Sequence, residues 1–158
     1  MTGEAKLRKA RLSDASGIFD LEQHFSSDRM SLRSVRNFLR SGSARVWVAV
    51  PGHESEVARP LLAALILLIR RGAKAARIYS VVVDPEARGQ GLGLRLIQRA
   101  EAAARAAGCR EIALEVHEEN ADARRLYARL GYAEGRRLAG FYEDGSDGLR
   151  LRKRLLAR

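Results

Sequence analysis

A strand, a glycine-rich turn and a long helix follow one another between residues 78 and 107, and this succession constrains the fold more than any other stretch. Residues 78–83 are rich in β-branched side chains and predict a buried strand, which Pro85 ends because proline donates no hydrogen bond to a ladder. From Leu92 to Ala107 apolar residues recur at helical spacing, and Gly108 stands just past the expected helix end. The turn at residues 88–93 therefore joins the end of a strand to the start of a helix.

Other segments show the alternation of strands or the period of amphipathic helices. Strands are predicted at residues 6–12, 45–50, 61–69, 110–116 and 149–155, helices at 13–25, 31–39 and 120–130, and polar turns at 51–52 and 70–77. Phe141-Tyr142 is placed in a loop or at the start of a further strand. The predicted order, β α α β β β α β α β β, describes an α/β fold with one mixed central sheet flanked by helices, and residues 1–158 are expected to form a single domain.

Composition narrows the class of protein. With 46% hydrophobic and 30% charged residues the chain resembles ordinary globular proteins, and its longest apolar run, residues 61–69, is far shorter than the ~20 residues that span a membrane. The first residues lack the apolar stretch of a signal peptide, so a cytoplasmic location is expected. The single cysteine, Cys109, excludes an internal disulfide, and His53 has no second histidine nearby, so no metal site is expected.

The formal net charge of +10 fits a polyanionic ligand, a nucleic acid or an acidic partner, or arginines on solvated faces. An aromatic content of 6% argues against a base-stacking surface, so nucleic acid is a possible partner that the sequence does not favour.

The glycine turn predicts a phosphate site. It reads Arg88-Gly89-Gln90-Gly91-Leu92-Gly93, and glycines allow a backbone whose N–H groups converge on an anion, an arrangement that the start of a helix reinforces. The Gly-Lys-Ser/Thr of a nucleotide P-loop is absent. Both registers of the dinucleotide fingerprint also fail, because Leu94 and Leu96 stand where a third glycine is required.

This turn and the segment after it resemble the GNAT superfamily of N-acetyltransferases. The similarity lies in VVVDPEARGQGLGLRLI, residues 81–97, and LEVHEENADARRLYARLGY, residues 114–132. The resemblance implies a GNAT-type fold and acetyl-CoA as cofactor. It further implies that the backbone of Val81, Val82 and Val83 pairs with the pantetheine arm and that Asn120 contacts the cofactor. The residues implied to hold the pyrophosphate are Arg88, Gly89, Gln90, Gly91, Leu92, Gly93 and Leu94.

Acetyl transfer to an amine is helped by a proton donor for the departing thiolate and a base for the amine. Tyr127 is the candidate donor and a candidate cofactor contact, because it matches the family's acid tyrosine and shares a helical face with Asn120, seven residues earlier. The alternative is a tyrosine that only packs beside Leu126 and Leu130.

Glu115 is the candidate base. It lies in an apolar strand on the face opposite to Leu114 and Val116, and a buried carboxylate without a partner acquires a raised pKa, which suits a base that works near neutrality. The alternative is a glutamate that faces solvent or pairs with a nearby arginine.

Within the superfamily the chain looks most like the RimI group, the ribosomal-protein-alanine N-acetyltransferases. Glu115 stands twelve positions before Tyr127 as in that group, and the segment GFYEDGSDGLRLRKRL, residues 140–155, resembles its ending. The resemblance implies that Phe141 and Tyr142 shape the acceptor groove. Gly148 replaces the usual alanine, and residues 24–31 lack the group's Pro-Trp pair.

The function predicted from the sequence is acetylation of a protein or peptide N-terminal α-amine, by a monomer or a homodimer. The alternatives are an acetyltransferase of a small amine, an enzyme that acetylates aminoacyl-tRNA as a basic RNA-associated protein, and a non-catalytic CoA-binding module, which would be expected to lose Tyr127.

Overall fold

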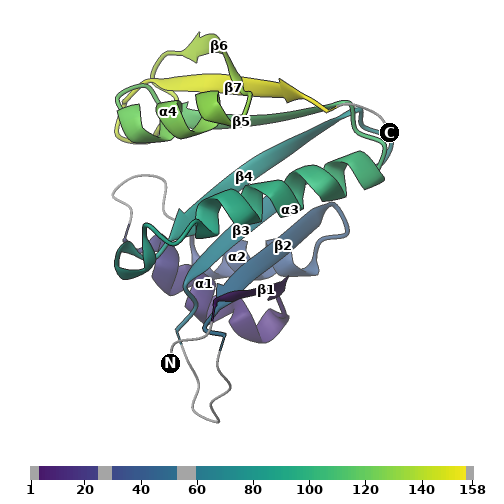
Figure 1. The fold of residues 1–158 in the computed structure, drawn as a ribbon, viewed down its shortest axis with the longest axis vertical. Coiled ribbons are helices and arrows are strands. Elements are labelled where there is room, and N and C mark those ends of the chain that lie inside the picture. The colour runs from purple at the N-terminus through teal and green to yellow at the C-terminus, as the bar shows by residue number, and fades with distance from the viewer. Residues whose placement is uncertain (1–3, 25–29, 53–59, 156–158) are drawn as a thin grey trace.

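A computed structural model describes residues 4–24, 30–52 and 60–155. In this part of the chain one seven-stranded mixed sheet has the order β1-β2-β3-β4-β5-β7-β6, with β4 and β5 parallel and the other neighbours antiparallel (Figure 1). The strands are β1 (Lys6–Lys9), β2 (Ala44–Val50), β3 (Ala63–Leu68), β4 (Ala75–Val83), β5 (Glu111–His117), β6 (Ala133–Leu138) and β7 (Gly148–Arg154).

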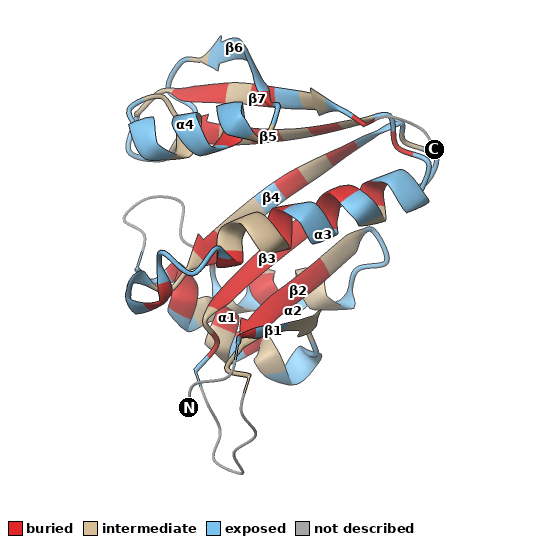
Figure 2. Cartoon of the chain, in the orientation of Figure 1, coloured by how far each residue is buried: buried red, intermediate tan, exposed pale blue. Residues whose placement is uncertain are grey.

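Helices cover both faces of the sheet. The helices α1 (Ala15–Glu22) and α2 (Leu32–Arg40) lie on one face, while α3 (Leu92–Ala106) and α4 (Ala121–Arg129) lie on the other. Alternating residues of β2 enter two separate cores: Val46 and Val48 pack toward α1 and α2, and Trp47 packs with Leu96 and other buried residues of α3. The central strands β2 and β3 are buried over most of their length, whereas buried and partly buried residues alternate along β5 (Figure 2). On α3 the buried residues follow one stripe of the helix. None of the helices in the described ranges is long and apolar enough to cross a bilayer.

The predicted α/β fold and element order are confirmed, with corrections at several bounds. The first strand ends at Lys9 rather than residue 12, because a 3-10 turn (Leu12–Asp14) follows it. The strand predicted from residue 78 begins at Ala75, within the stretch 70–77 assigned to a turn, because Ala75 and Ala76 pair with the parallel strand β5. Residues 26–29, between the first two predicted helices, and His53 lie outside the described residues.

The strand before the last one was misplaced by the sequence. It is β6, and Phe141-Tyr142 lies in the turn after it rather than in a strand. Five of the six residues of β6 are exposed, so this edge strand carries no alternating apolar pattern. Its pairing with β7 defines it instead.

A β-bulge in β4 changes which face of the sheet its side chains point to near the site. Ile66 of β3 pairs with Ser80 and Leu67 pairs with Ile78, so Tyr79 is the extra residue on β4. The extra residue reverses the alternation: Ala76 and Ile78 face the α3 core, whereas Val82 faces α1 and α2. At the same point β4 and β5 part, because their pairing ends at Ile78 and Leu114, and Figure 1 shows the wedge between the two ribbons.

Candidate active site

A pocket of about 610 Å³ opens where β4 and β5 diverge. Its wall contains seven of the residues singled out from the sequence: Val81, Val82, Glu115, Asn120, Tyr127, Phe141 and Tyr142. The glycine turn and Val83 are not part of this wall. They continue along β4 toward the start of α3. The predicted catalytic and acceptor residues are therefore gathered around one pocket, and the predicted phosphate site lies beyond it along the same strand.

The divergence leaves one backbone edge of β4 unpaired by β5. Asp84 N–H donates to the Leu62 carbonyl at 2.8 Å on the β3 side. N–H groups alternate in direction along a strand, so the N–H of Val82 also points to β3, while those of Val81 and Val83 point to the open edge. Two of the three valines predicted to pair with the pantetheine arm thus present backbone groups there, and Val82 contributes its side chain to the opposite core.

The glycine turn has the backbone of an anion site. Gly89 and Gly91 have φ of 85° and 73°, in the left-handed region that favours glycine. Gly91 is the N-cap of α3, and its carbonyl accepts from the Arg95 N–H at 3.0 Å. The N–H groups of Leu92, Gly93 and Leu94 precede that first i→i−4 bond and have no partner within the helix. Together with the helix dipole they form a site that fits a pyrophosphate.

Asn120 begins α4 as the sequence predicted. Its Oδ1 accepts from the Ala123 N–H at 3.1 Å, so the cap uses the amide oxygen. The amide NH₂ is a donor at the pocket wall.

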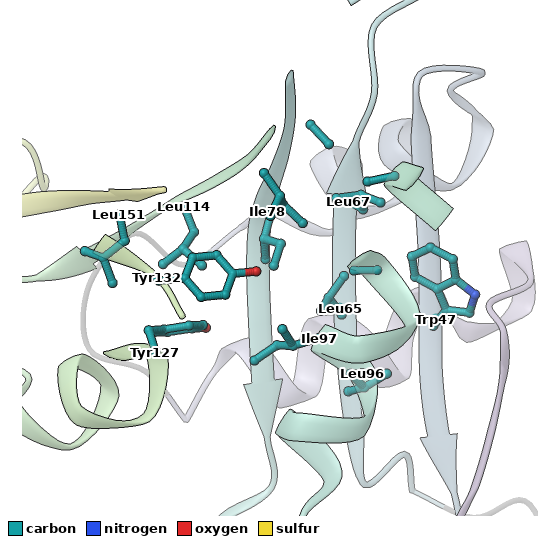
Figure 3. Packing of buried hydrophobic residues seen from close by; sticks show 14 of the residues in the cluster. Trp47, Leu65, Leu67, Ile78, Leu96, Ile97, Leu114, Tyr127, Tyr132 and Leu151 are labelled. Atoms are coloured by element: carbon teal, nitrogen blue, oxygen red, sulfur yellow. The ribbon is translucent and has the colours of Figure 1, made fainter. Parts of the chain in front are cut away.

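Tyr127 enters the pocket from α4. It is only 4% exposed and packs edge to face against Tyr132, with ring centroids 5.4 Å apart (Figure 3). Tyr127 is part of the pocket wall, and its hydroxyl has no hydrogen-bond partner among the described residues. Burial raises the pKa of Tyr127 well above its usual value, because the phenolate would be desolvated. The hydroxyl is therefore protonated throughout the physiological pH range and has a proton to donate.

Glu115 reaches the pocket from β5, on the sheet face opposite to Leu114 and Val116, as predicted. Its side chain is 6% exposed and is paired with two guanidinium groups. Arg77 Nε of β4 donates to Oε2 at 3.1 Å, and an Arg150 NH₂ group of β7 donates to Oε1 at 3.2 Å. Of the alternatives that the sequence left open for Glu115, the structure therefore contains the one in which it pairs with arginine.

The aromatic pair forms the outer wall of the pocket. Phe141 and Tyr142 meet edge to face at 5.0 Å, and the Tyr142 ring stacks on His117 with centroids 3.5 Å apart. The Ser146 hydroxyl and His117 Nδ1 are in hydrogen-bond contact at 3.1 Å. A Cβ at Gly148 would lie 3.2 Å from Phe141 Cδ1 and 3.3 Å from Tyr142 Cε2, which explains why glycine accompanies this pair.

The polar or aromatic side chains of the pocket wall that sequence reasoning missed include Glu22, Arg77, Tyr79 and Ser80. Glu22 comes from α1, and the others belong to the β4 bulge region. The sequence offered a weak signal only for Glu22, a carboxylate at the end of an amphipathic helix, and none for a bulge that turns Ser80 toward α1.

Comparison with known proteins identifies the family to which this pocket belongs. Residues 15–132, well over half of the chain, match the model of the Acetyltransferase (GNAT) family. The chain therefore belongs to the GNAT acetyltransferase family.

Relatives and solved structures agree with this assignment. Human N-alpha-acetyltransferase 30 is 29% identical over 129 residues, which cover 80% of this chain and 34% of the human protein. The chain spans 37%, 50% and 38% of the length of three other curated relatives. The ribosomal-protein-S18-alanine N-acetyltransferase from Escherichia coli has a TM-score of 0.83 at 20% identity, over 98% of this chain and 96% of that one.

Arabidopsis thaliana NAA60, solved in complex with acetyl-CoA, has a TM-score of 0.83 at 20% identity, over 96% of this chain and 98% of that one. At such identities the likeness of these structures shows the fold alone. Membership of this family makes acetyl-CoA the cofactor of the chain. The glycine turn fits the pyrophosphate of acetyl-CoA, and the open edge of β4 fits its pantetheine arm.

Proposed function

We propose that this protein transfers the acetyl group of acetyl-CoA to the N-terminal α-amine of a protein or peptide. The observation that carries the proposal is the wall of the pocket: Tyr127 enters from the α4 side, and Glu115 and the aromatic pair Phe141-Tyr142 border the rest. The 29% identity to an N-alpha-acetyltransferase over 80% of the chain supports a protein acceptor.

A more specific part of the proposal is that the acceptor is of the RimI type. It rests on the twelve-residue spacing of Glu115 and Tyr127 and on the Phe141-Tyr142 pair. The fold of this chain resembles that of the Escherichia coli enzyme and that of Arabidopsis thaliana NAA60 equally well, so the choice among these groups stays a prediction.

The roles of the residues follow from their surroundings. Acetyl-CoA supplies an activated acyl group as a thioester. The N–H groups of residues 92–94 hold its pyrophosphate, and the edge of β4 at Val81 and Val83 orients its arm. Tyr127, kept protonated by burial, holds the proton that the leaving thiolate requires. Glu115, fixed by Arg77 and Arg150, is the proposed acceptor of the amine proton.

A mass-spectrometric assay tests this proposal. Acetyl-CoA is supplied with a mixed set of peptides, each with a free or a blocked N-terminus and with lysine in some members. We expect acetylation of free N-termini only, and a loss of about 10²–10⁴-fold in kcat for Tyr127→Phe. Transfer to lysine side chains or to a small amine alone would overturn the proposed acceptor.

A further inference from the structure

Glu22 is a buried carboxyl group of the pocket that none of the roles above uses. It is the last residue of α1, is 5% exposed and lines the pocket together with Met30 and Ser80. Its recorded hydrogen bond comes from the Ser80 hydroxyl, which donates to Oε1 at 2.7 Å. Over the described residues no ion pair involves Glu22.

The two buried glutamates of the pocket, Glu22 and Glu115, differ in whether their carboxylates have ion-pair partners. Glu115 already has two cationic partners, Arg77 and Arg150. Glu22 has only a neutral hydroxyl as its partner, and desolvation raises its pKa although the Ser80 hydrogen bond partly offsets this. A cation that entered the pocket would relieve the cost of the ionised Glu22 carboxylate.

Two features of the fold direct this carboxyl group toward a cation. Glu22 lies at the C-terminal end of α1, where the partial negative charge of the helix dipole favours a positive group. The bulge at Tyr79 turns Ser80 to the same face, where its hydroxyl fixes one oxygen of Glu22. The other charged or histidine side chains of the pocket wall are Arg77, Glu115, His117, Glu119 and Asp144.

An α-amine supplies the cation that this arrangement lacks. With a pKa near 8, it is mostly protonated at pH 7. We propose that Glu22 and Ser80 form a binding subsite for the protonated primary amine of the acceptor, so that the substrate's own ammonium is the ion-pair partner of Glu22. The inference rests on the proposed function only in taking a primary amine as the acceptor.

Calorimetric titration tests the subsite without any turnover. The protein loaded with CoA is titrated with a short peptide that has a free N-terminus and with the N-acetylated form of the same peptide. We expect the wild type to bind the free peptide about tenfold more tightly, as a charge-assisted contact of this kind implies. In Glu22→Gln, which preserves size and can still accept from Ser80, the two peptides should bind equally.

Asp20→Asn is the matched control. It removes an exposed carboxylate from the same helix, outside the pocket wall, and should keep the wild-type preference. If the peptides bind and the wild type shows no preference, or shows the same preference as Glu22→Gln, the subsite does not exist.

Propylammonium chloride separates the failure of this inference from the failure of the proposed function. If neither peptide binds but propylammonium binds in a Glu22-dependent way, the peptide acceptor is wrong and the subsite stands. If no probe binds in a Glu22-dependent way, the inference is overturned whatever the acceptor proves to be.

Discussion

The side chain of Arg77 on β4 spans the point where β4 and β5 part and donates to Glu115 on β5 at 3.1 Å. The last paired residues of the two strands are Ile78 and Leu114, so Glu115 is the first residue of β5 beyond the pairing. Arg150 of β7 lies directly opposite Glu115 in the ladder and holds the other oxygen. The Glu115 carboxylate therefore links β4, β5 and β7 at the point where β4 and β5 diverge.

This arrangement separates a structural role of Glu115 from a chemical one. Glu115→Gln keeps the size of the side chain, and Arg77→Met keeps the carboxylate but removes one of its partners. If Glu115 receives the amine proton, we expect kcat to fall about 100-fold or more in Glu115→Gln and much less in Arg77→Met. Steady-state kinetics on a peptide acceptor measures both, and comparable losses in the two variants would contradict a chemical role.

A second buried carboxylate stabilises the half of the sheet that carries Tyr127. Glu101 of α3 accepts from the Tyr132 hydroxyl at 2.8 Å and from Lys153 Nζ of β7 at 3.0 Å. Desolvation and this hydrogen bond raise the pKa of Tyr132, which keeps its hydroxyl a donor. The Tyr132 ring in turn packs against Tyr127 beside Leu114 (Figure 3).

Removing the positive charge of Lys153 from this cluster should destabilise the protein. In Lys153→Met the charge of Glu101, whose side chain is 7% exposed, loses its partner, and we expect a loss of about 2–3 kcal/mol in the free energy of unfolding. The double variant with Glu101→Gln should recover most of that loss, because an amide carbonyl still accepts from Tyr132. Urea unfolding of the three proteins gives the answer, and a double variant as unstable as the single one would show that the charge is not the cause.

The sequence predicted the parts of the site that depend on local patterns. The glycine turn, the Asn120 cap and the facing of Glu115 each follow from spacing within one element, and the structure contains all three. The β4 bulge, the β6 edge strand and the Glu22–Ser80 contact depend on pairing between segments far apart in the chain. Glu22 and Ser80 are 58 positions apart, and no local period could bring them together.

Glu22 should reduce stability at neutral pH. Its folded-state pKa is raised by desolvation, so its contribution to stability is fully present at low pH and is lost as the pH rises through that value. We therefore expect Glu22→Gln to be more stable than the wild type at pH 7.5. The difference should shrink toward zero near pH 4. Urea unfolding across this range checks the sign, and a variant less stable than the wild type at pH 7.5 would contradict it.

The left-handed backbone at Gly91 should matter more for cofactor binding than the glycine two residues later. Gly91→Ala places a Cβ at φ 73° and should cost about 1 kcal/mol of stability while moving the N–H groups at the start of α3. Gly93 has no positive φ, and a Cβ there would lie 3.7 Å from Val83, an ordinary contact. Titration with acetyl-CoA should show weaker binding for Gly91→Ala only. Equal losses in both variants would mean that backbone conformation is not what holds the anion.

Gly148→Ala should alter acceptor binding while leaving the cofactor site intact. The new Cβ would lie 3.2 Å from Phe141 and 3.3 Å from Tyr142, so the aromatic pair must move by a few tenths of an ångström. Crowding of this size should cost about 1 kcal/mol of stability. The Tyr142 ring stacks on His117 at the pocket wall, so its displacement reshapes the acceptor side. We expect KM for the peptide to change several-fold and the Kd for acetyl-CoA to stay constant. An unchanged peptide KM would mean that the pair does not contact the acceptor, and a weaker acetyl-CoA affinity would mean that the substitution reaches beyond it.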